Sequence, residues 1–124
     1  MGLKYLYDTN VFIDYFSDRL EDLDLFNEKF IIENEVLISP VVRMELLSHP
    51  DITDDEDKLF TELLDNFESV EIDFEVEKET ILLRRKYKLK LPDAIIAASA
   101  IIEDAVLVTN DKKDFSKVSE LKIY

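Results

Sequence analysis

Short apolar runs alternate along this chain with segments whose apolar residues recur every three or four positions. The runs at residues 3–8, 36–39 and 106–109 have the length of strands and no helical period, and shorter runs at 70–72 and 121–124 predict two further strands. Strands that alternate with helices indicate a mostly parallel sheet covered on both faces. We therefore expect a three-layer α/β/α sandwich with a central sheet of four to five strands.

The helices between these runs have recognisable starts. Ser39 before Pro40 predicts an N-cap and a first helical residue, and Thr53 with Glu56 has the form of a capping box. Residues 94–102, which follow Pro92, are apolar almost all round and must be buried on most sides. The first predicted helices are 9–19, a short helix that contains Leu23, Phe26 and Phe30, and 41–48. The helix after Thr53 carries Leu59, Phe60, Leu63, Leu64 and Phe67 on one face. The last two are 73–87, with an apolar face of Phe74, Ile81, Leu82 and Tyr87, and the helix that begins at Pro92.

Four acidic residues stand beside these apolar elements. Asp8 closes the first run, Glu45 follows the second closely, Asp93 opens the buried helix, and Asp111 follows the apolar run at 105–110. In α/β domains, sites form outside the carboxyl ends of the strands, so we expect these carboxylates to converge. A cluster of like charges is costly to keep ionised unless a hard cation such as Mg2+ or Mn2+ binds it.

Each acid also has a purely structural explanation, and for single residues both readings stay open. Taken together, in a chain with no Gly-rich phosphate loop, the four acids favour a metal site. Asp8 would be a helix N-cap, although Thr9 or Asn10 could also take that role, and Glu45 would face solvent near Arg43. Asp93 would be a favourable acid in the first turn of its helix. Asp111 would be a turn residue, and Asp114 could take that role instead.

The composition narrows the chemistry. The chain has 124 residues, no Cys and one His, which excludes disulfides, thiolate catalysis and a His-based zinc site. His49 precedes Pro50 where a helix should end, so we assign it to a helix end and not to catalysis. We expect a single domain over residues 1–124 and, with no membrane-length apolar run and no leader-like N-terminus, a soluble cytoplasmic protein.

Charge is distributed unevenly. The net charge is −14, which argues against an anionic partner, but residues 51–79 alone hold 13 acids against two Lys. Basic residues cluster at 84–90 and 112–117, beside Asp93 and Asp111. These clusters are either solvated faces or a surface that guides a phosphate backbone.

Four segments, residues 7–14, 39–46, 91–98 and 108–115, together give the chain a family likeness over nearly its whole length. It resembles the PIN-domain ribonucleases and, within them, the VapC-type toxins of toxin–antitoxin modules. The first and third segments are the more specific ones. The resemblance implies metal-dependent endonucleolytic hydrolysis of RNA that leaves a 5′-phosphate and a 3′-hydroxyl.

The resemblance also implies a set of site residues and a cofactor, Mg2+ or Mn2+. Asp8 and Asp93 are expected to be the central ligands, and the other acids to complete the shell or orient water. The implied set is Asp8, Glu45, Asp93 and Asp111 as catalytic metal ligands, Asp114 as a residue that shares or replaces the role of Asp111, and Asn10 and Thr109 as supporting residues.

Members of this family commonly form homodimers and are silenced by a small antitoxin that places a basic residue near the acids. The acidic 51–79 stretch would suit such a partner, and a complex that survives charge reversal of residues 54–57 would contradict this. Two other function classes remain: a non-catalytic PIN-like module that binds RNA or protein, and a receiver-type phosphoacceptor domain. The second needs paired acids near the first strand, where the chain has only Asp8.

Overall fold

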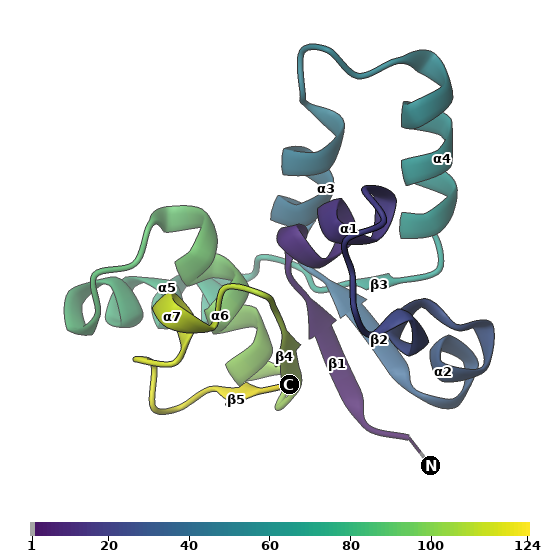
Figure 1. Cartoon of the computed structure of the whole chain (residues 1–124). Coiled ribbons are helices and arrows are strands. Elements are labelled where there is room, and N and C mark those ends of the chain that lie inside the picture. The colour runs from purple at the N-terminus through teal and green to yellow at the C-terminus, as the bar shows by residue number, and fades with distance from the viewer. Residues whose placement is uncertain (1) are drawn as a thin grey trace.

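A computed structural model describes residues 2–124; Met1, which belongs to the predicted domain, lies outside the described residues. The described chain forms a five-stranded sheet with helices around it (Figure 1). In chain order the elements are β1 (Lys4–Tyr7), α1 (Thr9–Phe16), the 3-10 helix η1 (Leu23–Phe26), α2 (Glu28–Glu33), β2 (Glu35–Ile38), α3 (Pro40–Leu47), α4 (Asp54–Leu64), β3 (Glu68–Ser69), α5 (Phe74–Lys86), α6 (Leu91–Ile102), β4 (Val106–Val108), α7 (Lys112–Phe115) and β5 (Lys122–Ile123).

The sheet has the order β3-β2-β1-β4-β5, and every neighbouring pair of strands is parallel. This confirms the predicted α/β class and the mostly parallel sheet. The third strand, however, forms at Glu68–Ser69 and not at 70–72, because the register pairs Leu37 with Glu68. Val70 still donates its N–H to the carbonyl of Ile38 at 2.8 Å.

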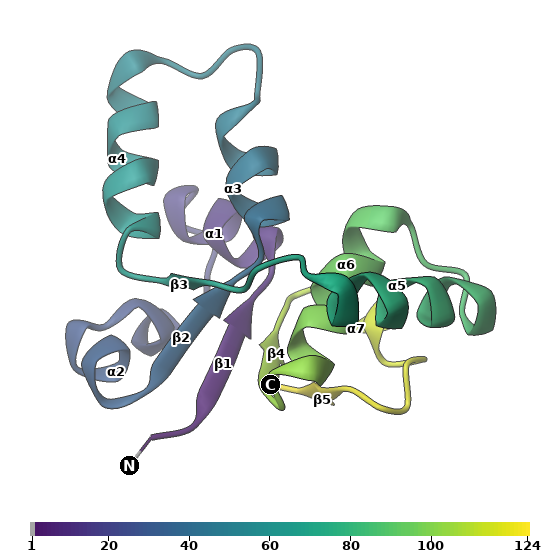
Figure 2. The same cartoon turned by 180° about the vertical axis from the view of Figure 1, so that it is seen from behind.

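Helices cover both faces of the sheet. Consecutive residues of a strand point to opposite faces, and Leu6 and Tyr7 in β1 are both fully buried. The Tyr7 hydroxyl donates a hydrogen bond of 2.5 Å to the carbonyl of Leu25 in η1, whereas α6 packs on β1 and β4. Seen from behind, α5 lies against α6 on the side of the molecule that carries β4 and β5 (Figure 2).

The helix starts predicted from sequence are confirmed. Ser39 caps α3 by accepting the Val41 N–H, Pro40 is the first helical residue, and both bonds of the Thr53–Glu56 capping box are present. The body of α6 is buried as expected. Within residues 2–124, no helix combines the length and apolar character needed to cross a membrane.

The predicted apolar face of α5 is wrong. The face that packs against α6 carries Val76, Thr80 and Leu83, at helical spacing i, i+4 and i+7, and all three are buried. Of the predicted face, only Tyr87 packs against the core. The other side chains of that predicted face are exposed: Phe74 by 69%, Ile81 by 44% and Leu82 by 53%.

Candidate metal centre

The acids predicted from sequence come from elements that meet at the carboxyl edge of the sheet. Asp8 directly follows β1, and Asp111 follows β4 and caps α7. Because β1 and β4 are parallel neighbours, the ends of these two strands lie side by side. Asp93 is the third residue of α6, and Glu45 lies in α3.

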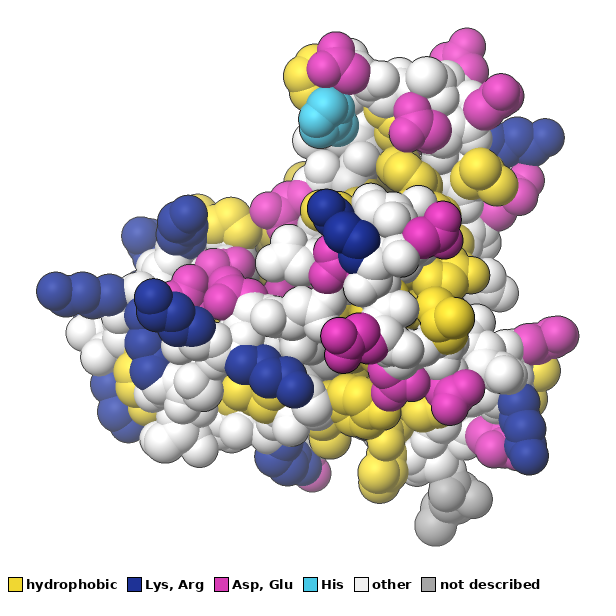
Figure 3. Space-filling model, in the orientation of Figure 1, with side chains coloured by type: hydrophobic (Ala, Val, Ile, Leu, Met, Phe, Trp, Pro, Cys, Tyr) yellow, Lys and Arg dark blue, Asp and Glu magenta, His cyan; other side chains and the backbone are white. Residues whose placement is uncertain are grey.

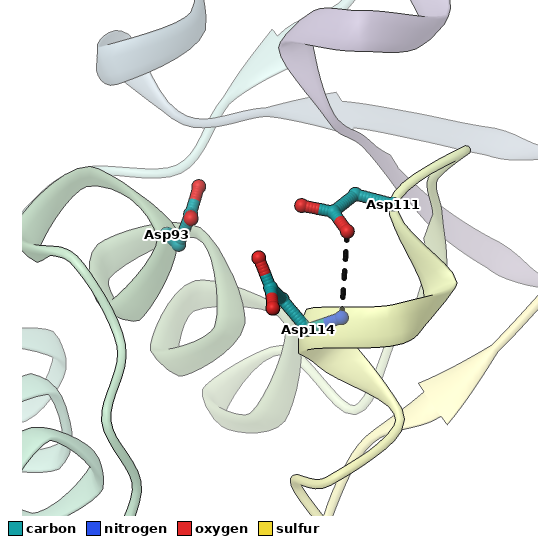
Figure 4. A group of neighbouring side chains, drawn as sticks. All are labelled: Asp93, Asp111 and Asp114. Atoms are coloured by element: carbon teal, nitrogen blue, oxygen red, sulfur yellow. Dashed lines mark hydrogen bonds between the residues drawn. The ribbon is translucent and has the colours of Figure 1, made fainter.

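Three of the carboxylates form a tight group. Asp93, Asp111 and Asp114 each offer a carboxylate oxygen such that these atoms lie within 4.8 Å of one another. Figure 4 shows the carboxylates of Asp111 and Asp114, at the start of α7, directed toward the side chain of Asp93 on α6. The Asp114 N–H donates to Asp111 Oδ1 at 3.4 Å, so Asp111 is both a helix cap and a member of the group.

Asp8 lies at the buried side of this group. Its side chain is 3% exposed and accepts two hydrogen bonds of 2.8 Å, from the Thr9 N–H and from the Thr109 hydroxyl. The pKa of Asp8 is raised to about 6, mainly by burial and also by the charges of Asp93 and Glu45, while these two hydrogen bonds act in the opposite direction. The negative charge of Asp8 is therefore destabilised in the folded protein, and a bound cation would compensate for it.

Asp93 lies close enough to four other carboxyl groups for charge to affect the pKa of Asp93 or of its neighbour. Burial raises the pKa of Asp93, as do the negative charges of Asp111, Glu45 and Asp114, while Lys90 lowers it. We refer to the five residues as the acid cluster: Asp8, Glu45, Asp93, Asp111 and Asp114. Of the four predicted acids, Asp93 and Asp111 lie in the close group, together with Asp114. Asp8 and Glu45 lie outside this 4.8 Å group but near enough for charge to connect them with Asp93.

Thr9 connects two members of the acid cluster. Its backbone N–H donates to Asp8, and its hydroxyl donates to Glu45 Oε1 at 2.7 Å. Glu45 is exposed on α3, so this bond fixes an otherwise free carboxylate. The sequence predicts Thr9 only as an alternative helix cap, because its bond to Glu45 depends on the packing of α1 against α3.

The two residues expected to support the cluster differ. Thr109 is buried and donates to Asp8, as a supporting residue would, and it also accepts the Asp111 N–H at 3.0 Å. Asn10 is exposed on α1, and within residues 2–124 its side chain makes no hydrogen bond to the acids. The prediction that Asn10 holds the cluster finds no contact to support it.

The sequence does not predict a second polar connection, between Asn110 and Asp14. Asn110 donates through Nδ2 to Asp14 Oδ2 at 2.5 Å, and Asp14 also forms a salt bridge of 3.5 Å with Arg19. This ties the loop that carries Asp111 to α1. Asn110 follows a predicted strand, and this position indicates a residue near the site. Nothing in the sequence around Asp14 distinguishes it from an acid that faces solvent.

The donor set suits a hard divalent cation. The acid cluster supplies only carboxylate oxygens, and Mg2+ and Mn2+ prefer oxygen ligands. Hydrogen bonds from Thr9 and Thr109 pre-orient two of these carboxylates. The residues present therefore fit such an ion.

The chain also resembles known proteins. A family model described as the PIN domain matches residues 5–121. A chain of the solved toxin–antitoxin complex from Klebsiella pneumoniae is 31% identical, with 94% of each chain covered and a TM-score of 0.78. No curated protein matches the sequence.

Two further solved structures share the fold. A chain of VapBC2 from Rickettsia felis, bound to a DNA fragment of its promoter, has a TM-score of 0.85 at 22% identity, with 98% of each chain covered. A chain of DNA-bound VapBC from Salmonella typhimurium also has a TM-score of 0.85, at 20% identity, with 98% of this chain and 97% of that chain covered.

Proposed function

The chain belongs to the PIN domain family, and we propose that it is a metal-dependent endoribonuclease and the toxin of a type II toxin–antitoxin pair. The observation that carries this proposal is the acid cluster, in which one carboxylate oxygen from each of Asp93, Asp111 and Asp114 lies within 4.8 Å of the others, and in which the charge of Asp93 acts on the buried Asp8. Repulsion of this kind is relieved by a bound cation. The toxin assignment is supported by the 31% identical chain in a solved toxin–antitoxin complex.

In this proposal Asp8 and Asp93 hold Mg2+ or Mn2+, and Glu45, Asp111 and Asp114 complete the oxygen shell or orient water. Such an ion polarises a phosphoryl oxygen and lowers the pKa of water. The protein's own contribution is orientation: Thr109 and Thr9 hold Asp8 by hydrogen bonds of 2.8 Å, so its carboxylate keeps one position.

The test is cleavage of total cellular RNA by the purified chain with Mg2+ or Mn2+, beside an EDTA control. We expect Asp8→Asn and Asp93→Asn to abolish metal-dependent cutting. Asp24→Asn is the matched control, because Asp24 is exposed in η1 outside the acid cluster. If the folded, partner-free protein cuts no RNA with either metal, the proposal fails and a non-catalytic binding module becomes the better reading.

An antitoxin would have a suitable seat in a groove formed by α1, α3 and α4. The groove has a volume of about 680 Å3, and Glu45 of the acid cluster lies in its wall. Asp51 and Glu56 add negative charge there, which suits a basic amphipathic segment. The apolar side chains that line it are Ile13, Phe16, Leu46, Ile52, Leu59 and Phe60.

This seat is tested by co-purification of the antitoxin with the tagged chain. Leu59→Glu should lose the antitoxin, because Leu59 lines the groove and is 56% exposed. Leu23→Glu is the control, since Leu23 is 61% exposed and lies outside the groove. Equal retention of the antitoxin by both variants would contradict the seat.

The homodimer belongs to the same proposal. Light scattering of the purified chain should give twice its mass of 14.5 kDa. A mass of one chain at all concentrations used for cleavage would contradict it.

A further inference from the structure

The N-terminal and C-terminal parts of the chain carry opposite charge. Residues 1–79 hold six Lys and Arg against 23 acids, a net charge of −17, whereas residues 80–124 hold nine against six, a net charge of +3. Three of those six acids belong to the acid cluster. Figure 3 shows Lys and Arg side chains gathered on the side of α5 and α7, around a patch of Asp and Glu.

The two basic clusters predicted from sequence meet in space. Lys117 donates through Nζ to the carbonyl of Lys88 at 3.3 Å and lies 4.0 Å from Asp114. Lys90 stands three residues before Asp93 and lowers its pKa. The clusters therefore form one basic surface that borders the acid cluster.

Most of this positive charge has no carboxylate partner in the part of the chain that the structure describes. Within residues 2–124, salt bridges pair Lys86 with Glu120 and Lys117 with Asp114. The remaining basic side chains of the two clusters form no salt bridge to a carboxylate in that range, so they are available to an external anion. These are Arg84, Arg85, Lys88, Lys90, Lys112 and Lys113.

A groove lies within this surface, between the C-terminal half of α5 and the segment that leads into α6. Its volume is about 640 Å3, and four of the unpaired basic residues line it, from Arg84 to Lys90. Its apolar lining includes Ile81 and Leu91, which are 44% and 50% exposed. We call it the basic groove. It combines positive charge for phosphates with apolar surface for a base.

We propose that the basic groove binds an unpaired stretch of RNA and positions it at the acid cluster. This inference rests on the proposed function, and it specifies that the RNA substrate is single-stranded where it is bound. Phosphates lie against the Arg and Lys side chains, and a base packs on Ile81 and Leu91. A duplex keeps its bases stacked inside, so only an unpaired strand can use the apolar surface. RNA is favoured over an acidic protein because the groove borders the acid cluster, since Lys90, which lines the groove, stands three residues before Asp93.

The experiment measures RNA binding without cleavage, in the Asp8→Asn background with EDTA. The probe is a short fluorescent RNA, either unpaired or annealed to its complement, followed by anisotropy. Arg85→Glu with Lys88→Glu is compared with Lys29→Glu with Lys58→Glu, which changes the net charge equally outside the groove. The groove variant should bind unpaired RNA at least about tenfold more weakly and lose about 1.4 from its salt slope.

The apolar part of the groove is tested separately with Leu91→Ser, which should weaken binding of unpaired RNA several-fold without changing the salt slope. Circular dichroism checks that each variant is folded. Equal weakening by both charge variants, or tighter binding of the duplex, would overturn the proposal. So would a groove variant that binds RNA normally but changes its molar mass, since the groove would then be a contact between subunits.

Failure of this inference is distinguishable from failure of the proposed function. Unchanged cleavage by the groove variant with intact acids would reject the groove and keep the nuclease. Groove-dependent binding by a protein that cuts no RNA would keep the groove and reject the nuclease.

Discussion

The Thr109 hydroxyl donates a hydrogen bond of 2.8 Å to Asp8 Oδ2, although the two residues are 101 positions apart. The Thr109 hydroxyl oxygen also accepts a hydrogen bond of 3.0 Å from the Asp111 N–H. Thr109 therefore fixes the ends of β1 and β4 relative to each other and positions two members of the acid cluster at once. It is a positioning residue, because it acts through Asp8 and Asp111.

Replacing Thr109 with Val should weaken both stability and metal binding. The change removes one donor from Asp8 and leaves the Asp111 N–H without its acceptor, which costs about 1–3 kcal/mol of unfolding free energy. Urea unfolding gives that loss, and the rise in melting temperature with added Mg2+ should shrink. Ser99→Ala is the control, since the Ser99 hydroxyl is also buried but bonds the Ile95 carbonyl within α6. An equal response of both variants to Mg2+ would contradict the positioning role.

Neutralising Asp8 or Asp93 should stabilise the metal-free protein while abolishing its response to metal. Each substitution to Asn removes a charge that the other acids repel. A bound cation stabilises the folded state by mass action, so the wild-type melting temperature should rise with Mg2+ or Mn2+ and that of Asp8→Asn should stay flat. Differential scanning fluorimetry measures both effects. A wild-type protein that is unaffected by either metal would show that the carboxylates bind none.

The free energy of unfolding of the metal-free protein should fall as pH rises from about 4 to about 6. Burial raises the pKa of Asp8 from 3.8 to about 6, so the folded state holds this proton more tightly than the unfolded chain does. Stability is thus greatest with Asp8 protonated, and the loss is on the order of 3 kcal/mol. Urea unfolding in EDTA across this range checks it. Asp8→Asn should lose most of the slope, and the raised pKa of Asp93 accounts for the rest.

Features that depend on residues close in sequence could be predicted, and features that depend on contacts between distant elements could not. Apolar runs and caps are local, so the strands at 3–8 and 106–109 and the start of α3 were predicted to within a residue or two. Acids at strand ends converge because parallel strands share an edge, which the pattern already implied. The bond between Thr9 and Glu45 could not be predicted, because it depends on how α1 packs against α3.

The buried face of α5 illustrates the same limit. Apolar residues lie on two faces of this helix, and only the docking of α6 selects the one with Leu83. Leu83→Ala should therefore cost about 2–5 kcal/mol of unfolding free energy. Leu82→Ala, the adjacent and 53% exposed position, should change it by less than about 0.5 kcal/mol. Urea unfolding compares the pair, and similar losses would mean that both faces are buried in solution.

Asp111 and Asp114 should both contribute to metal binding. One carboxylate oxygen of each lies within 4.8 Å of one carboxylate oxygen of Asp93, and the negative charge of each raises the pKa of Asp93. Asn at position 111 can still cap α7, so Asp111→Asn removes charge while keeping the local structure. We expect each single Asn variant to weaken Mg2+ affinity, measured by calorimetry, and the double variant to weaken it further. Glu120→Gln is the control, because Glu120 pairs with Lys86 outside the cluster. If only one single variant loses affinity, that residue alone is the fourth acid.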